Sequence, residues 1–197
     1  MGTDFEELEM IADFFNTHDR RMRFENDPGV EHLNQAEALK HWLLLHHLIS
    51  KEDEVNDENL NIAIQLRNET RKLIVNNVFD GQGNVTDPLK ELNELLHSFS
   101  FTFRFTGEHE ELLPMQDGGR KGLGHLLVLI FELRRNKMWN RIRVCSAADC
   151  QWVFVDRSRP GTGKWCTMKA CGNRAKNKAF RERKKTKGIK ANETTDL

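Results

Sequence analysis

Residues 145–174 read CSAADCQWVFVDRSRPGTGKWCTMKACGNR, and this stretch holds all four cysteines of the chain. Their spacing is C-x4-C-x15-C-x4-C, two close pairs joined by a linker long enough for a short hairpin. Such pairs are typical of a tetrahedral zinc site, because each pair turns the chain around the metal. The spacing predicts one structural Zn²⁺ ion bound by Cys145, Cys150, Cys166 and Cys171.

Two disulfide bonds are the alternative interpretation of the four thiols. A secreted disulfide scaffold follows a signal peptide, but this chain begins MGTDFEELEM, which is acidic where a signal peptide is basic. The longest apolar runs, such as LLVLIF at 126–131, are too short to span a bilayer. We therefore expect a cytoplasmic protein with reduced thiols, and no membrane partner.

The net charge of the 197-residue chain is zero, but the charges are strongly segregated. Residues 1–133 carry 12 Lys and Arg against 25 Asp and Glu, whereas residues 134–190 carry 18 against 3. Such a division indicates a polyanionic partner for the basic part, unless that part docks on the acidic part of the same chain.

The basic residues beyond the last cysteine recur at helical spacing, so that several share one face of a helix. Beside a zinc site, a basic helix is more often a phosphate-binding surface than a solvated one, so we expect it to bind nucleic acid, with DNA favoured over RNA. The candidate nucleic-acid-binding residues are Arg174, Lys176, Lys178, Arg181, Arg183, Lys184 and Lys185.

The first 140 residues have the apolar periodicity of a mainly helical domain. Helices are expected from Leu8 to Phe15, over 38–49 behind a capping box at Asn34 and Glu37, over 57–79 with Gly81 as the stop, from 87–88 onward, and after residue 119. Phenylalanines alternate with polar residues over 99–105, which predicts one strand of a hairpin with 110–115. The last helix is expected to turn Leu123, Leu126, Leu127, Ile130 and Phe131 inward.

The fold class predicted from these patterns is α+β, mainly α. A helical domain with a small β-hairpin over 1–140 is followed by a zinc module over 141–190 and a short tail over 191–197. In the zinc module, the alternation over 151–155 predicts one strand of a hairpin, and the second cysteine pair lies at the start of a helix. A hairpin and a helix that share a metal form a treble-clef-like or ribbon-like arrangement.

A polar cluster follows the apolar part of the first helix. Asn16, Thr17 and Arg20 are candidate ligand-binding residues, because arginine in a cleft favours an anionic ligand. A role in capping and salt bridging is the equally weighted alternative.

Two stretches resemble known families. The cysteine-rich segment, with Trp152, Phe154, Trp165 and the tetrapeptide Cys171-Gly172-Asn173-Arg174, resembles the CGNR-type zinc finger. DFFNTHDRR at 13–21 resembles the opening of the ABATE domain, which precedes that finger in bacterial proteins. The resemblance implies a stress-responsive transcription regulator, a label based largely on the finger.

The sequence contains no nucleophile motif of the G-x-S-x-G kind, and 161–164 lacks the flanking residues of a phosphate-binding loop. We therefore expect no enzymatic activity. The function predicted is that of a zinc-dependent DNA-binding transcription regulator whose N-terminal domain senses a ligand or forms a homodimer. The alternatives are an RNA-binding or ribosome-associated factor, and a hydrolase with its site around Asn16 and Arg20.

Overall fold

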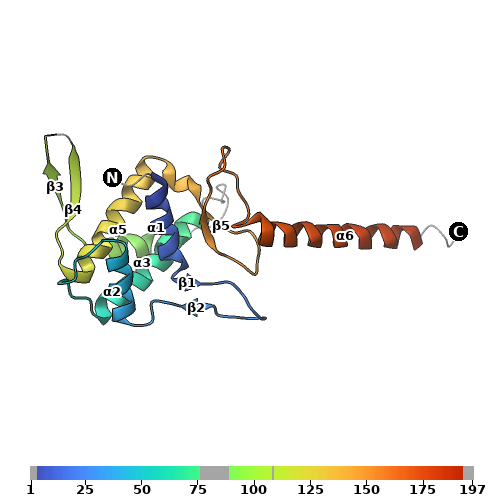
Figure 1. Ribbon diagram of the computed structural model, residues 1–197, viewed down its shortest axis with the longest axis horizontal. Helices are drawn as coiled ribbons and strands as arrows, with labels where there is room; N and C mark the ends of the chain where they lie inside the picture. The colour runs from blue at the N-terminus through green and yellow to red at the C-terminus, as the bar shows by residue number, and fades with distance from the viewer. Residues whose placement is uncertain (1–3, 76–88, 108, 193–197) are drawn as a thin grey trace.

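The computed structural model describes residues 4–75, 89–107 and 109–192, and these residues are mainly helical (Figure 1). Helices α1 to α5 form a compact body, whereas α6 leaves it as a single rod (Figure 1). The predicted α+β class with a majority of helix is confirmed. No helix within these residues is both long and apolar enough to cross a membrane. The helices are α1 (Asp4–Asn16), α2 (Ala36–Leu45), α3 (Asp57–Val75), α4 (Lys90–Leu96), α5 (Gly118–Arg135) and α6 (Asn173–Asn192).

The strands of the described residues form three antiparallel hairpins. The hairpins pair β1 (His18–Asp19) with β2 (Val30–Glu31), β3 (Phe101–Phe105) with β4 (Glu110–Pro114), and β5 (Ile142–Val144) with β6 (Val153–Val155). The second hairpin was predicted from the sequence. In the third, the strand over 151–155 was predicted, but its partner was expected in the linker between the cysteine pairs, whereas β6 pairs with β5, which precedes Cys145. The first hairpin was not predicted, because two residues per strand are too few to leave a period-two pattern.

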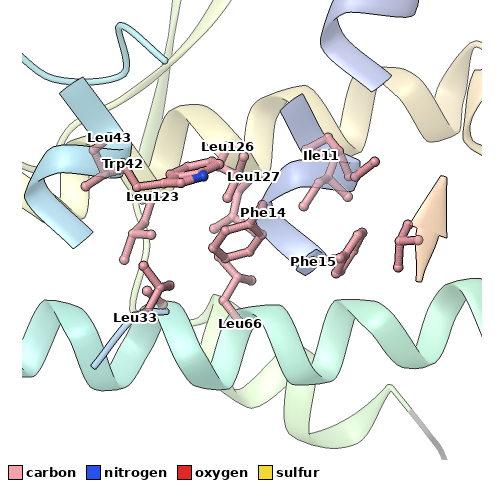
Figure 2. Packing of buried hydrophobic residues seen from close by; sticks show 14 of the residues in the cluster. Ile11, Phe14, Phe15, Leu33, Trp42, Leu43, Leu66, Leu123, Leu126 and Leu127 are labelled. Atoms are coloured by element: carbon pink, nitrogen blue, oxygen red, sulfur yellow. The ribbon is translucent and has the colours of Figure 1, made fainter. Parts of the chain in front are cut away.

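Helix α1 lies at the centre of the hydrophobic core, packed against α3 and α5 (Figure 2). The predicted apolar face of this helix is buried, and Leu8, Ile11 and Phe15 have no exposed surface. Phe14, on another side of the helix, is buried as well, and its ring lies 5.2 Å from the ring of Trp42 in α2. Helix α1 is therefore covered on more than one side, by α3 and α5 and by Trp42 of α2.

The β5–β6 hairpin, although it belongs to the cysteine-rich segment, is built into this same core. Ile142 and Val153 are buried in one cluster with the side chains of α1 and α3. The amide of Asn16 pairs with both backbone groups of Val153: its Nδ2 donates to the carbonyl oxygen at 2.8 Å, and its Oδ1 accepts from the N–H at 2.9 Å. This side chain therefore takes the place of a neighbouring strand along β6.

The ends of α2 differ from the prediction. Its N-cap is Gln35, without a side-chain hydrogen bond, so the capping box at Asn34 and Glu37 does not form. The helix ends at Leu45 rather than at 49, because His47 adopts a left-handed conformation with φ 56°. The N–H groups of His47 and Leu48 then bond back to carbonyl groups of the last turn, as in a Schellman motif.

The aromatic hairpin β3–β4 projects away from the body (Figure 1). Phe99 is buried, but Phe103 and Phe105 are 71% and 77% exposed, so the alternation marks a strand without marking a buried face. Phe131 of α5, expected to point inward, is also mostly exposed. The expected end of α3 at 79–81 and the helix start at 87–88 lie outside the described residues.

Replacing Asn16 by alanine is expected to lower the free energy of unfolding by about 2–4 kcal/mol, because both backbone groups of Val153 would be left buried without partners. Urea unfolding followed by circular dichroism measures the change. Asn61→Ala on the exposed side of α3 is the matched control, with a change below about 1 kcal/mol. Equal effects of the two substitutions would contradict a structural role for the Asn16 amide.

Candidate metal centre

The first cysteine pair lies in the turn between β5 and β6. Cys145 follows β5 directly, and its N–H donates to the carbonyl oxygen of Trp152 at 2.9 Å. The N–H of Cys150 donates to the carbonyl oxygen of Ala147 at 2.9 Å, which closes a tight turn. Gln151 then adopts φ 51°, so β6 begins at Val153 rather than at 151 as predicted. This left-handed residue turns the chain out of the metal-binding loop and into the strand.

The second pair brackets the start of the helical segment, as predicted. Cys166 precedes Thr167, which is the N-cap of the π-helical turn η3 (Met168–Gly172) and accepts a hydrogen bond from the N–H of Ala170. Cys171 lies in that turn, and α6 begins two residues later. The N–H of Ser146 in the first loop donates to the carbonyl oxygen of Lys164 at 2.8 Å and so joins the two loops.

The four sulfur atoms converge on one point. All four Sγ atoms lie within 4.8 Å of one another, and the Cys150–Cys166 and Cys166–Cys171 distances are both 3.7 Å. A tetrahedral zinc ion with Zn–S bonds of about 2.3 Å places its sulfur ligands roughly 3.8 Å apart, whereas a disulfide needs about 2 Å. The four cysteines are free thiols, so the disulfide alternative does not hold in this structure.

The site therefore fits one structural zinc ion. Four thiolates fill a tetrahedral coordination sphere and leave no position for a water molecule or a substrate. Burial raises the pKa of the Cys166 thiol to about 11, and burial together with the neighbouring thiols raises that of Cys150. Without a cation these two thiols hold their protons at neutral pH, so zinc must displace protons when it binds, and its affinity falls as the pH falls.

Arg174, the last residue of the CGNR tetrapeptide, contacts the metal centre. Its Nη2 donates to the Sγ atom of Cys171 at 3.2 Å, and its Nη1 forms an ion pair with Asp149 at 3.2 Å. It therefore joins the first turn of α6 to the first cysteine loop. A donor to a metal-bound thiolate orients the ligand and reduces its negative charge, as outer-sphere partners do.

The helical body also reaches the zinc module through a second arginine. The guanidinium group of Arg21 lies 4.2 Å from the centre of the Trp152 ring, and it is held there by two hydrogen bonds to the carboxylate of Asp19. The bond from Arg21 lowers the pKa of the buried Asp19 carboxyl. Trp152 and Trp165 both pack on the cysteine cluster, which favours a core role for these rings over base stacking.

The three candidate ligand-binding residues are close in space, but two of them make structural contacts. Asn16 is bonded to Val153, and the hydroxyl of Thr17 donates to the carbonyl oxygen of Phe14 and accepts from Arg67. Arg20 is half-buried, and its Nε donates to His18. Ligand binding by these residues stays a prediction, whereas Asn16 and Arg21, at the two ends of this polar run, contact Val153 and Trp152 of the zinc module.

The candidate nucleic-acid-binding residues lie along α6. Arg174, Lys178 and Arg181 line one groove of about 890 Å³, whose opposite wall is the first cysteine loop. The side chain of Lys185 is outside the described residues. The other members, which are exposed on the same helix, are Lys176, Arg183 and Lys184.

Two buried arginines of α3, Arg67 and Arg71, were not predicted from the sequence. Arg67 forms an ion pair with Glu31, and Arg71 donates to the carbonyl oxygen of Gln151, next to a zinc ligand. One signal was available: the two residues are four positions apart on a helix whose neighbouring positions are apolar and buried, which is costly for a charge without a partner.

Comparison with known families agrees with the two resemblances. The ABATE family model, described as "Putative stress-induced transcription regulator", matches residues 8–130, and the CGNR zinc finger model matches residues 141–184. No curated protein matches the chain. The domain limits at 140 and 190 stay a prediction, since the structure joins the two parts in one core.

Replacing Arg174 by glutamine is expected to weaken zinc binding by roughly tenfold, because Cys171 loses its charged donor. Competition with a chelator of known affinity measures the change. Arg181→Gln removes the same charge about two turns further along α6 and serves as the control, with unchanged zinc affinity. If both variants released zinc equally, the contact between Arg174 and Cys171 would have no role in the metal site.

Proposed function

The chain belongs to the ABATE family, and we propose that it is a zinc-dependent DNA-binding regulator that contacts DNA through α6. The zinc finger match and the four converging cysteines give the coarser function, a zinc-binding protein of regulatory type. The observation that carries the finer proposal is the basic rod that leaves the zinc centre.

Helix α6 is strongly basic, and its side chains over 176–184 are exposed. It holds nine Lys and Arg against one acidic residue, Glu182. It extends away from the acidic helical body rather than docking on it (Figure 1). The element that it contacts most is η3, which precedes it directly. A charged rod of this kind offers its side chains to a partner outside the chain.

The like charges of α6 also disfavour the helix by itself. Arg174 and Lys178 are four residues apart, as are Arg181 and Lys185, and pairs of equal charge at this spacing destabilise an isolated helix. Phosphate groups along a nucleic acid would remove this repulsion and release counterions at the same time. Binding of a polyanion would therefore stabilise the helical conformation of α6.

The zinc centre fixes the position and orientation of the start of α6. Cys171 and the contacts of Arg174 fix the first turn of α6 against the first cysteine loop. The groove between that loop and α6 carries Lys178 and Arg181 on its helical wall, so phosphates would be received on one defined side. Loss of zinc would leave every positive charge in place but remove their common orientation.

We propose a binding role rather than a catalytic one. Four thiolates complete the coordination of zinc, and both polar groups of the Asn16 amide are engaged by Val153, which weighs against the hydrolase alternative. The helical body is proposed to sense a ligand, and homodimerisation is its second candidate role. The side chains of Phe103 and Phe105 on the β3–β4 hairpin are exposed, and such apolar side chains could pack against a second copy of the chain.

DNA binding is tested by fluorescence anisotropy with a labelled duplex over a series of salt concentrations. The affinity of the zinc-loaded protein is expected to fall steeply with salt. Replacing Lys178 and Arg181 together by alanine should weaken binding and flatten the log–log salt slope by about 1.8, which corresponds to two phosphate contacts. Lys51→Ala with Lys90→Ala, on the exposed surface of the body, is the control and should leave the slope unchanged.

The same assay separates the alternatives. Structured RNA as competitor should displace the duplex less effectively than unlabelled DNA does. Stronger competition by RNA would favour an RNA-binding or ribosome-associated factor. If the zinc-loaded protein bound neither nucleic acid at low salt, the regulator proposal would be rejected.

A further inference from the structure

Three arginines gather where the helical body meets the zinc module. Arg20 follows β1, while Arg67 and Arg71 lie one turn apart on α3. Arg67 is 1% exposed and Arg71 is 5% exposed, which is unusual for a residue that carries a permanent charge. The three side chains therefore form a positively charged cluster, called here the arginine cluster, inside the protein.

The N–H donors of the arginine cluster outnumber the hydrogen-bond acceptors that surround them. Arg67 donates through Nη1 to the hydroxyl of Thr17 at 2.9 Å and to the carboxylate of Glu31 at 2.7 Å. Arg71 donates through Nη2 to the carbonyl oxygen of Gln151. Arg20 donates through Nε to His18 at 3.3 Å. The buried Nε of Arg67 and Nη1 of Arg71 have no hydrogen-bond partner in the structure.

The charges are unbalanced as well. Among the described residues, Glu31 is the carboxylate that bonds to the arginine cluster, so three positive charges face one negative charge. Burial, together with the charges of Arg20 and Arg67, lowers the pKa of Arg71 to about 10. Arginine does not give up its proton in proteins, so a buried excess of this kind calls for an anion.

One side of the arginine cluster reaches the surface, because Arg20 is half-buried and the side chain of Glu31 is 33% exposed. The Nη1 atom of Arg71 is itself buried, so an anion that entered at Arg20 would reach this atom only after side chains had moved. Guanidinium groups bind phosphate and carboxylate through paired, charge-assisted hydrogen bonds, which are stronger than neutral ones.

We propose that the arginine cluster binds a small oxyanion, a phosphate or the phosphate group of a small molecule, through Arg20 and Arg71. The inference deepens the sensing role proposed for the helical body and rests on it for its biological meaning. It replaces the predicted ligand residues Asn16 and Thr17 by Arg71 of α3, and it keeps Arg20.

The position of Arg71 connects this site to the zinc module. One amino group of its guanidinium, Nη2, holds the carbonyl oxygen of Gln151, the residue that follows the zinc ligand Cys150. An oxyanion on Nη1 would fix the orientation of the guanidinium group and so would strengthen its hold on the carbonyl oxygen of Gln151 in the first cysteine loop. Anion binding is therefore expected to slow the release of zinc.

The test uses the zinc-loaded full chain and inorganic phosphate at constant ionic strength, without nucleic acid. Isothermal titration should give saturable binding, and Arg20→Gln should weaken it about tenfold or more, because one charge-assisted contact is lost. Arg135→Gln, an exposed arginine of α5, is the control and should bind as the unchanged protein does. A second arm with methyl phosphate shows whether the site accepts a phosphate ester.

Zinc release to a chelator is measured in the same samples. Phosphate should slow it in the unchanged protein and in the variant with Lys178 and Arg181 replaced by alanine, but not in Arg20→Gln. Arg71→Lys keeps the charge and loses the paired donors, and it should also bind more weakly. No saturable binding, or equal binding by Arg20→Gln, would overturn the site, and phosphate binding without an effect on zinc release would overturn the connection. Because no DNA is present, failure of DNA binding would leave these outcomes unaffected.

Discussion

The structure depends on one constraint: the β5–β6 hairpin must be held at both of its ends. At the loop end, the metal site gathers four thiols that have no other reason to approach one another. Along the strand, the amide of Asn16 satisfies both backbone groups of Val153, which would otherwise be buried without partners. Since Val153 and Ile142 lie in the core of the helical body, the metal site and that core stabilise each other.

This arrangement gives a physical route between the body and α6. Arg71 holds the residue after Cys150, Arg21 covers Trp152, and Arg174 joins Cys171 to Asp149 at the start of α6. In each contact, an arginine side chain touches a zinc ligand or a residue close to the first cysteine pair. A change at the body side of this interface would reach the first turn of α6 without passing through a flexible linker. The proposed regulator would use this property, because the orientation of a basic helix decides how phosphates are received.

Much of this architecture could be predicted from the sequence because its signals are local. The cysteine spacing identified the metal ligands, and apolar periodicity identified the helices and the strand over 101–105. What the sequence did not show depends on contacts that are distant in the sequence. The polar run at Asn16 was predicted either to bind a ligand or to serve in capping and salt bridging, and its partner Val153 could not be identified because it lies 137 residues further along. Arg67 and Arg71 are surface residues by type, and only the fold reveals that Glu31 and Gln151 approach them. Phe131 has the helical spacing of the buried residues of α5, but its side chain is 54% exposed.

The central claim is that the zinc module and the helical body unfold as one unit. Heating the zinc-loaded protein while recording far-ultraviolet circular dichroism and the fluorescence of a zinc-binding dye in the same sample tests it directly. Structural zinc contributes on the order of 10–16 kcal/mol to the folding of isolated fingers, and here part of that free energy would support the helices. The account predicts that zinc release and loss of helix occur at one temperature, and that a chelator lowers both together. Zinc release in a separate, earlier transition with the helical signal intact would contradict it.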